Sequence, residues 1–234
     1  MNDAPIGVFD SGVGGVSVLK TCLDVLPNEN FVYLADRSGM PYGNKSHEEI
    51  EKRVELCVRT LQGEGVKAVV AACNTATNVG IASLRKKYDM PFVGLEPAVK
   101  PAVAACTRGN VLVLLTPLAA KQEKFRELVK KHDNGRLIIA PQEDLAEKVE
   151  EHIDDFRALK KPTFDILRAY KNVECVVLGC THYVFLRPLV EEFYGGRIKI
   201  FDGNDGAARR LKTLLEQNGK MSCLGRRSLK FIVI

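Results

Sequence analysis

Four strand ends recur in this chain at an almost constant offset, and this repeat constrains the fold more than any other feature. Short apolar runs that end in polar or glycine residues are typical of buried parallel strands. At offsets of 105 to 107 residues, Asp10 matches Thr116, Ala35 matches Ala140, Cys73 matches Cys180, and Glu96 matches Asp202. A single match is ordinary in a regular α/β protein. Four in the same order, with cysteine matched to cysteine, predict two copies of one structural half.

The strands and helices expected from the pattern alternate along the chain. The expected strands cover residues 6–9, 31–34, 68–72, 91–95, 111–115, 137–139, 175–178 and 198–201, and 229–234 is a candidate last strand. Helical patterns cover about 15–25, 46–62, 118–131 and 186–193, and the second of these begins at a capping box, Ser46 to Glu49. This alternation predicts an α/β fold with parallel sheets.

Composition excludes several classes of protein. The chain has 234 residues, of which 46% are hydrophobic and 27% charged, as in ordinary globular proteins. The net charge is +5 and the basic residues are scattered, and the short pair Arg226–Arg227 is too small for a nucleic-acid-binding patch. No apolar stretch approaches the roughly 18 residues of a membrane span, and the N-terminus does not resemble a signal peptide. We therefore expect a cytoplasmic protein that binds neither nucleic acid nor membrane.

The seven cysteines divide into two groups. Thiols stay reduced in the cytoplasm, and the absence of C-x-x-C argues against a zinc ribbon or a thioredoxin motif. Five cysteines are interpreted as core residues or carry no motif: Cys22, Cys57, Cys106, Cys175 and Cys223. Cys73 and Cys180 instead follow strands directly, where ligands of open α/β sheets bind.

Paired cysteines at these positions predict a proton-transfer reaction. If the two halves face each other about a pseudo-twofold axis, the thiols of Cys73 and Cys180 approach one cleft from opposite sides. One can remove a proton from a stereocentre while the other returns a proton to the opposite face. A thiol suits both tasks, because its reference pKa of about 8.5 lies near working pH.

Neighbouring residues supply candidate assistants for each thiol. His182 lies two residues after Cys180, so in an extended segment its ring would point to the same side. Asp10 ends the first strand, near the expected position of Cys73. The glycine-rich turn 10–15 lacks the spacing of nucleotide-binding loops and is interpreted as a turn that exposes backbone N–H groups to a carboxylate. His47, His132 and His152 are interpreted as structural.

These motifs together resemble those of the glutamate racemases in the aspartate/glutamate racemase superfamily. The resemblance is carried by FDSGVGGVSVL (9–19), MPYGNKS (40–46), ACNTAT (72–77), GLEPAVKPA (94–102) and VLGCTHYVFLRP (177–188), and it spans residues 6 to about 207. It implies two pseudo-twofold-related, flavodoxin-like α/β/α domains with the active site between them. The first domain would comprise 1–96 plus 206–234, and the second 97–205.

The resemblance also implies an activity and its residues. Such enzymes interconvert L- and D-glutamate without a metal or pyridoxal cofactor, supply D-glutamate for peptidoglycan, and often form homodimers. Cys73 would act on D-glutamate with help from Asp10, and Cys180 on L-glutamate with help from His182. The matching substrate-holding positions are Asp10, Ser11, Pro41, Tyr42, Gly43, Asn74, Thr75, Thr116, Thr181 and His182.

The chain departs from the family pattern after Thr116. Ala119, Gln122 and Phe125 stand where the family has threonine, serine and tyrosine, so one carboxylate contact is lost or replaced. The family's active-site glutamate is assigned to Glu150, with Glu147 as the alternative. Two other functions stay open: racemisation of another amino acid such as aspartate, and a non-catalytic amino-acid-binding module.

Overall fold

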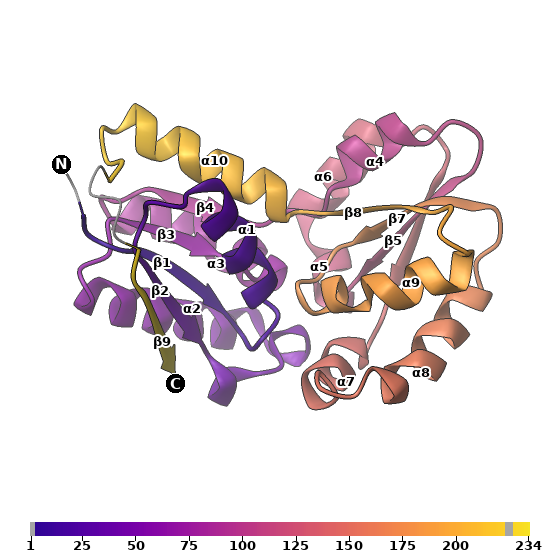
Figure 1. The fold of residues 1–234 in the computed structure, drawn as a ribbon, viewed down its shortest axis with the longest axis horizontal. Coiled ribbons are helices and arrows are strands. Elements are labelled where there is room, and N and C mark those ends of the chain that lie inside the picture. Colours follow the sequence, from indigo (N-terminus) through magenta and orange to yellow (C-terminus); the bar gives the residue numbers. More distant parts are fainter. Residues whose placement is uncertain (1–2, 223–226) are drawn as a thin grey trace. The chain divides into compact units, whose positions relative to one another are not determined.

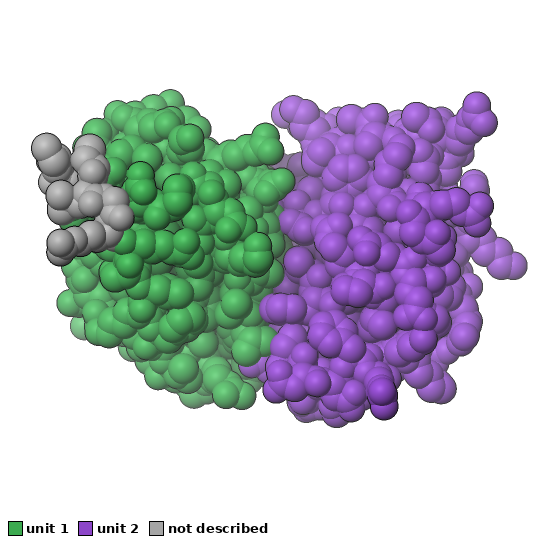
Figure 2. Space-filling view, viewed as in Figure 1, with its two compact units in different colours: residues 1–96, 204–234 green, residues 97–203 purple. Residues whose placement is uncertain are grey.

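The computed structural model describes residues 3–222 and 227–234, so Cys223 and Arg226 lie outside the described residues. Figure 1 shows the helices and strands, and Figure 2 colours two compact units separately. The first unit comprises Met1–Glu96 and Asn204–Ile234, and the second Pro97–Gly203. No helix among the described residues is both long enough and apolar enough to cross a membrane.

The first unit is built on a five-stranded parallel sheet with the order β4-β3-β1-β2-β9. Its strands are β1 (Ile6–Asp10), β2 (Phe31–Ala35), β3 (Ala68–Ala71), β4 (Phe92–Gly94) and β9 (Leu229–Val233). Its helices are α1 (Val16–Val25), α2 (His47–Gly63), α3 (Asn74–Lys87) and α10 (Asn204–Gln217), with the short 3-10 helices η1 (Arg37–Gly39) and η2 (Tyr42–Asn44).

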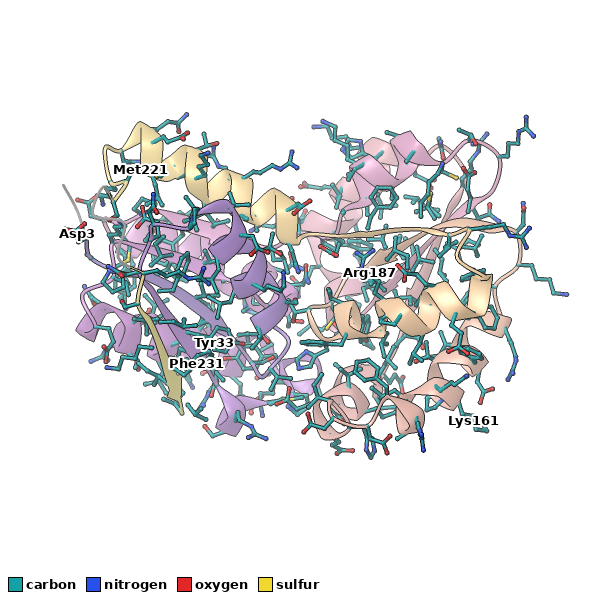
Figure 3. All side chains as sticks on the ribbon, in the orientation of Figure 1. Asp3, Tyr33, Lys161, Arg187, Met221 and Phe231 are labelled. Carbon is teal, nitrogen blue, oxygen red and sulfur yellow. The ribbon has the colours of Figure 1, made fainter. Side chains whose placement is uncertain are left out.

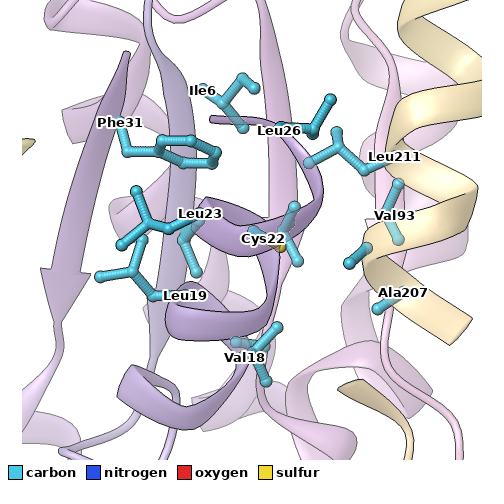
Figure 4. Close-up of a cluster of buried hydrophobic side chains, with 14 of the residues drawn as sticks. Ile6, Val18, Leu19, Cys22, Leu23, Leu26, Phe31, Val93, Ala207 and Leu211 are labelled. Carbon is cyan, nitrogen blue, oxygen red and sulfur yellow. The ribbon is translucent and has the colours of Figure 1, made fainter. Parts of the chain in front are cut away.

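Helices cover both faces of this sheet. On one face, apolar side chains of α1 and α10 pack on strand residues such as Ile6 and Phe31, and Figure 4 shows part of this core. On the other face, α2 lies close to the strands: a β-carbon on Gly7 would stand 2.9 Å from Leu61. β1, β2 and β3 are buried on both faces, so they are almost entirely apolar rather than alternating, as expected for a parallel sheet.

The second unit repeats this plan with a four-stranded parallel sheet in the order β6-β5-β7-β8. Its strands are β5 (Asn110–Leu115), β6 (Leu137–Pro141), β7 (Val173–Leu178) and β8 (Lys199–Asp202). Its helices are α4 (Val99–Ala105), α5 (Pro117–Lys121), α6 (Glu123–His132), α7 (Leu145–Glu151), α8 (Phe156–Arg168) and α9 (Arg187–Tyr194), with the 3-10 helix η3 (His182–Leu186). One face packs against α7, α8 and α9, and the other against α4, α5 and α6.

The two sheets share one topology. When the strands are numbered in chain order within each unit, both sheets have the spatial order 2-1-3-4, which is flavodoxin-like. All eight expected strands are present, with ends that differ by one or two residues, and the candidate strand at the C-terminus pairs in parallel with β2. The predicted α/β fold with two parallel-sheet units is therefore confirmed.

One expected helix was wrong. The pattern over 118–131 predicted a single helix, but the chain forms α5 and α6, with Gln122 extended between them at φ −70° and ψ 139°. Both Ala119 and Phe125 are buried in the same core. Six residues along one straight helix turn through about 600°, which would place these side chains roughly 120° apart. The break at Gln122 allows both to face the sheet.

Candidate active site

Each unit brings its chemically interesting residues to the ends of its two central strands. In the first unit, Asp10 ends β1, and Cys73 follows β3, the neighbouring strand. In the second, Thr116 follows β5, and Cys180 follows β7, its neighbour. These strand pairs are where the strand order reverses, and ligands bind beyond the carboxyl ends of strands at such points. We call the groups around Cys73 and Cys180 the first and second cysteine clusters.

Asp10 is buried and closes the turn that follows β1. Its Oδ2 accepts hydrogen bonds from the backbone N–H groups of Gly12, at 3.3 Å, and Gly15, at 2.9 Å. The Tyr33 hydroxyl donates to the Gly12 carbonyl at 2.7 Å. A β-carbon on Gly15 would come within 2.5 Å of the Asp10 side chain, which is why the turn needs glycine there. The carboxylate is thus held in one orientation.

Cys73 is the N-cap residue of α3. Its Sγ accepts a hydrogen bond from the backbone N–H of Ala76 at 3.4 Å. The N-terminus of a helix carries partial positive charge and stabilises an anion such as a thiolate. The thiol therefore has a backbone partner for its charged form, and Asp10 ends the strand next to the one that Cys73 follows.

Polar side chains beside Cys73 are buried as well. Ser11, Asn74 and Thr75 are all almost fully shielded. Within the described residues, the Oδ1 atom of Asn74 has no hydrogen-bond partner. Buried acceptors in proteins are nearly always paired. This one is therefore suited to a donor that comes with a ligand.

The segment after η1 carries Pro41, Tyr42 and Gly43. Tyr42 and Gly43 begin the short helix η2, so their N–H groups have no acceptor inside that helix. The Tyr42 side chain, however, is buried and donates from its hydroxyl to Asp36 Oδ2 at 2.6 Å. Burial, followed by Cys57 and the bond to Asp36, raises the pKa of Tyr42 well above its ordinary value. The ring therefore anchors the segment.

The second cysteine cluster is a chain of three side chains. The Sγ atom of Cys180 lies 3.9 Å from Nδ1 of His182, and Nε2 of His182 lies 2.8 Å from Oε2 of Glu150. His182 and Glu150 are both nearly buried. Of the two alternatives left by the sequence, Glu150 on α7 is the glutamate that contacts the histidine.

The reason given for the approach of His182 to Cys180 was wrong. An extended segment was expected, but Thr181 has helical dihedral angles and His182 begins η3. The Tyr183 N–H bonds to the Cys180 carbonyl at 3.0 Å and closes the turn. A tight helical turn, rather than strand alternation, brings the imidazole back to the thiol.

The hydrogen bond to Glu150 defines what the imidazole can do. A carboxylate only accepts hydrogen bonds, so Nε2 carries a proton. Nδ1 is then the basic nitrogen and faces the Cys180 thiol. This arrangement is typical of an activated side chain, in which an acid or nucleophile contacts a base and a third group orients the base.

Two threonines of this unit, Thr116 and Thr181, follow the ends of β5 and β7, and both are buried. Thr116 is the N-cap of α5 and accepts from the Ala119 N–H at 3.3 Å. Ala119 and Phe125, which depart from the family pattern, both pack in the core below α5 and α6. Phe125 therefore brings no polar group to the strand ends.

The other described cysteines have different surroundings. Burial raises the pKa of Cys22 and of Cys57 to about 12, and that of Cys175 to about 11. Cys106 donates to the Gly109 carbonyl at 3.0 Å. The thiols of Cys22, Cys57 and Cys175 are thus protonated at neutral pH, in keeping with core positions.

Two contacts in the first unit were missed at the level of sequence. The N-cap role of Cys73 had a signal, since CNTAT places a small polar residue before a helical run. The contacts of Asp36 with Arg53 had none, because 17 residues separate them and neither stands in a recognisable motif.

In the described part of the chain, no group of three or more His, Cys, Asp or Glu has the geometry of a metal site.

Comparison with known proteins identifies the family. The family model for Asp/Glu/Hydantoin racemases matches residues 6–211. A glutamate racemase of Clostridium kluyveri is 41% identical over 217 residues, which are 91% of this chain and 84% of the relative.

Solved structures agree with this assignment. A glutamate racemase isoform of Bacillus anthracis superposes with a TM-score of 0.87 at 26% identity, covering 100% of this chain and 89% of that one. Escherichia coli glutamate racemase, crystallised with L-glutamate and the activator UDP-MurNAc-Ala, gives 0.84 at 33% identity over 91% of this chain and 82% of that one. The chain therefore belongs to the Asp/Glu/Hydantoin racemase family and, within it, to the glutamate racemases.

Proposed function

We propose that this protein interconverts L- and D-glutamate by moving the α-proton between Cys73 and Cys180. The observation that carries the proposal is the matched position of the two thiols. Each follows the third strand of its own sheet, beside the end of the first strand, and each has a partner for its proton or its charge. The proposal rests equally on membership of the glutamate racemases.

The reaction needs one thiolate and one thiol. A thiolate takes the α-proton, so that the Cα–H bond breaks and an S–H bond forms, and the electron pair is left on the Cα–carboxylate group. The opposite thiol then gives its proton to the other face of Cα and becomes a thiolate. We assign removal of the proton from D-glutamate to Cys73 and from L-glutamate to Cys180.

Different groups prepare the two thiols. In the first cluster, the N-terminus of α3 stabilises the negative charge of the Cys73 thiolate, and the buried Asp10 accepts the proton of the thiol. In the second, His182 takes the Cys180 proton on Nδ1, and Glu150 stabilises the imidazolium that results. Asp10 and His182 thus act in acid–base roles, and Glu150 takes part in catalysis through His182.

Substrate recognition falls to the polar groups around both cysteines. The unpartnered Oδ1 of Asn74 accepts from the ammonium group, and backbone N–H groups of Tyr42 and Gly43 donate to a carboxylate. Ser11, Pro41, Thr75, Thr116 and Thr181 complete the proposed binding set. We also propose the two compact units as the protein's domains, with boundaries near residues 96 and 205.

Replacement of either cysteine tests the mechanism. Cys73→Ala and Cys180→Ala should each lose racemisation in both directions by a factor of about 10³ or more, because each removes one acid–base group outright. Turnover of L- and D-glutamate is followed by optical rotation, and folding by circular dichroism. Wild-type racemisation by purified, folded Cys73→Ala would overturn the mechanism.

Isotope exchange separates catalysis from mere binding. In D₂O, wild-type protein should place deuterium at Cα of glutamate during turnover, whereas an amino-acid-binding module gives none. Aspartate is assayed beside glutamate under the same conditions. Faster exchange into aspartate would retain the mechanism but overturn the proposed substrate.

The cellular setting follows from the same proposal. We place the enzyme in the cytoplasm, where it would supply D-glutamate for peptidoglycan. The described cysteines are all free, in keeping with a reducing compartment.

We further propose that the protein forms a homodimer. The edge strand β9 supports this, since Leu229, Phe231 and Val233 are 39%, 59% and 64% exposed along one side of it. Apolar side chains on an exposed edge strand favour association. Analytical ultracentrifugation should give a dimer for wild type and a monomer for the double variant Phe231→Lys/Val233→Lys. A monomeric wild type would contradict the proposal.

A further inference from the structure

The segment that joins β2 to α2 holds Pro41, Tyr42 and Gly43, and one buried carboxylate ties it together. Asp36 directly follows β2 and is 0% exposed. Its Oδ1 accepts from the Gly39 N–H at 3.1 Å, and its Oδ2 accepts from the Tyr42 hydroxyl at 2.6 Å. A β-carbon at Gly39 would collide with this carboxylate. Asp36 therefore determines the path of the chain from its own position to Tyr42.

A buried carboxylate of this kind needs a cation to offset its lost hydration. Arg53, on α2, provides it: Nε donates to Asp36 Oδ2 at 2.7 Å, and Nη2 donates to Oδ1. This fork is the bidentate geometry that only arginine offers. The bond to Asp36 also raises the pKa of Arg53.

Arg53 contacts the segment at a second point. Its Nη2 also donates to the Ser38 hydroxyl at 2.5 Å. The Ser38 N–H in turn donates at 3.0 Å to the carbonyl of Ile234, the residue that follows β9. Residues 36–42 are thus held from α2, through Arg53, and from β9, through the backbone.

We propose that Arg53 is a positioning residue for the racemase: through Asp36 it holds Tyr42, and so fixes the backbone N–H groups of Tyr42 and Gly43 that receive a substrate carboxylate. This inference rests on the proposed function. Arg53 does not touch the substrate, since its guanidinium is committed to Asp36 and Ser38. Its charge keeps the binding segment in shape.

The expected kinetic signature follows from that role. A carboxylate that does not change charge during proton transfer is held equally in the ground state and in the transition state. Loss of such uniform binding raises KM and leaves kcat unchanged. Arg53→Met should therefore raise KM for L- and D-glutamate by about tenfold, while kcat stays within about twofold of wild type. Arg53→Lys keeps the charge and loses the bidentate hydrogen bonds. Its KM should lie between those of wild type and Arg53→Met.

A neighbouring lysine provides the matched control. Lys52 is also a cation on α2, but it pairs with Glu48 in solvent, where both side chains are more than 70% exposed. Lys52→Met should leave KM, kcat and the hydrogen-exchange rates of the backbone amides at wild-type values. Thermal unfolding followed by circular dichroism establishes that each variant is folded.

Hydrogen exchange measures the same role without substrate. If Arg53 positions the segment, backbone amides of residues 39–45 should exchange at least tenfold faster in Arg53→Met than in wild type, while amides of β1 and β3 keep their rates. A purely stabilising arginine would accelerate exchange throughout the first unit and leave KM unchanged.

The outcomes separate the two proposals. Wild-type KM values and unchanged exchange over 39–45 in folded Arg53→Met would overturn the positioning role and leave the racemase proposal intact. A wild-type protein with no activity on glutamate would overturn the proposed function, and the exchange experiment would still decide whether Arg53 orders the segment.

Discussion

Single side chains in the second cysteine cluster work only through their neighbours. The Cys180 thiol has an imidazole 3.9 Å away, and that imidazole is useful as a base because Glu150 fixes the proton on its far nitrogen. A neutral group in place of Glu150 would no longer stabilise the imidazolium formed when His182 takes a proton. The carboxylate therefore matters through charge as well as through its hydrogen bond.

Glu150→Gln should accordingly lower kcat by about 10²-fold, the lower end of what one acid–base group contributes. Glutamine can keep a hydrogen bond to His182, so the fold should persist. Glu147→Gln, on the same helix, is the matched comparison and should keep kcat within about threefold. Steady-state rates measured by optical rotation decide between them. A loss of kcat in Glu147→Gln but not in Glu150→Gln would assign the active-site role to Glu147 instead.

Individual residues also show why only part of the site could be predicted. Cys73, Cys180, Asp10 and His182 were recognisable because each lies at or just after a strand end in a short motif, and strand ends are where such folds bind ligands. Tyr42, in contrast, bonds to Asp36, and Asp36 is paired with Arg53 on the next helix. Sequence patterns describe neighbours along the chain, so a contact of this kind leaves no local signal.

Strands were more predictable than helices, because burial on both faces gives central strands such as β1, β2 and β3 almost uninterrupted apolar runs. The break between α5 and α6 at Gln122 contains neither proline nor glycine. It arises from the need to bury Ala119 and Phe125 against the same sheet face, which is a tertiary requirement. The parallel pairing of β9 with β2 was likewise set by the sheet edge available to it, not by its own residues.

The loop between α4 and β5 illustrates how one side chain can determine a connection. Glu174, on β7, accepts backbone N–H bonds from Thr107, Arg108 and Gly109 at 2.8 to 2.9 Å, and Lys199 lies 3.1 Å away. The N–H groups of Gly109 and Arg108, followed by the Lys199 bond, lower the pKa of Glu174 well below its usual 4.5. The charged carboxylate thus holds the loop closed.

This shift predicts how the stability of the loop depends on pH. The pKa of Glu174 is lower in the folded than in the unfolded chain, so its contribution is fully present above about 4.5 and is lost as pH falls toward the folded value. Glu174→Gln should therefore lower Tm at pH 7 by a few degrees, and the difference should shrink at pH 3.5. Thermal scans of both proteins at the two pH values test this. An equal difference at both would exclude the charge as the cause.

Across the whole chain, one topology supports two different ways of managing a thiol. In the proposed mechanism, the first unit uses a helix N-terminus and a buried carboxylate, and the second an imidazole with its carboxylate. L- and D-glutamate are mirror images with equal free energies, so the equilibrium constant is one. The ratio kcat/KM must then be the same in both directions for any variant. Unequal chemistry in the two units is compatible with this, because every complete reaction in the proposed mechanism uses both cysteines.

This requirement predicts the result of mixing inactive chains. Cys73→Ala keeps Cys180, and Cys180→Ala keeps Cys73, but neither chain carries both. If each chain completes its own site, a mixture of the two variants in equal amounts should racemise glutamate no faster than the sum of the separate proteins, even after unfolding and refolding together. Wild type mixed with Cys73→Ala should lose activity in proportion to dilution. Recovery of more than about a tenth of wild-type activity in the refolded mixture would mean that the first unit of one chain works with the second unit of another, and that a complete site can be assembled from two chains.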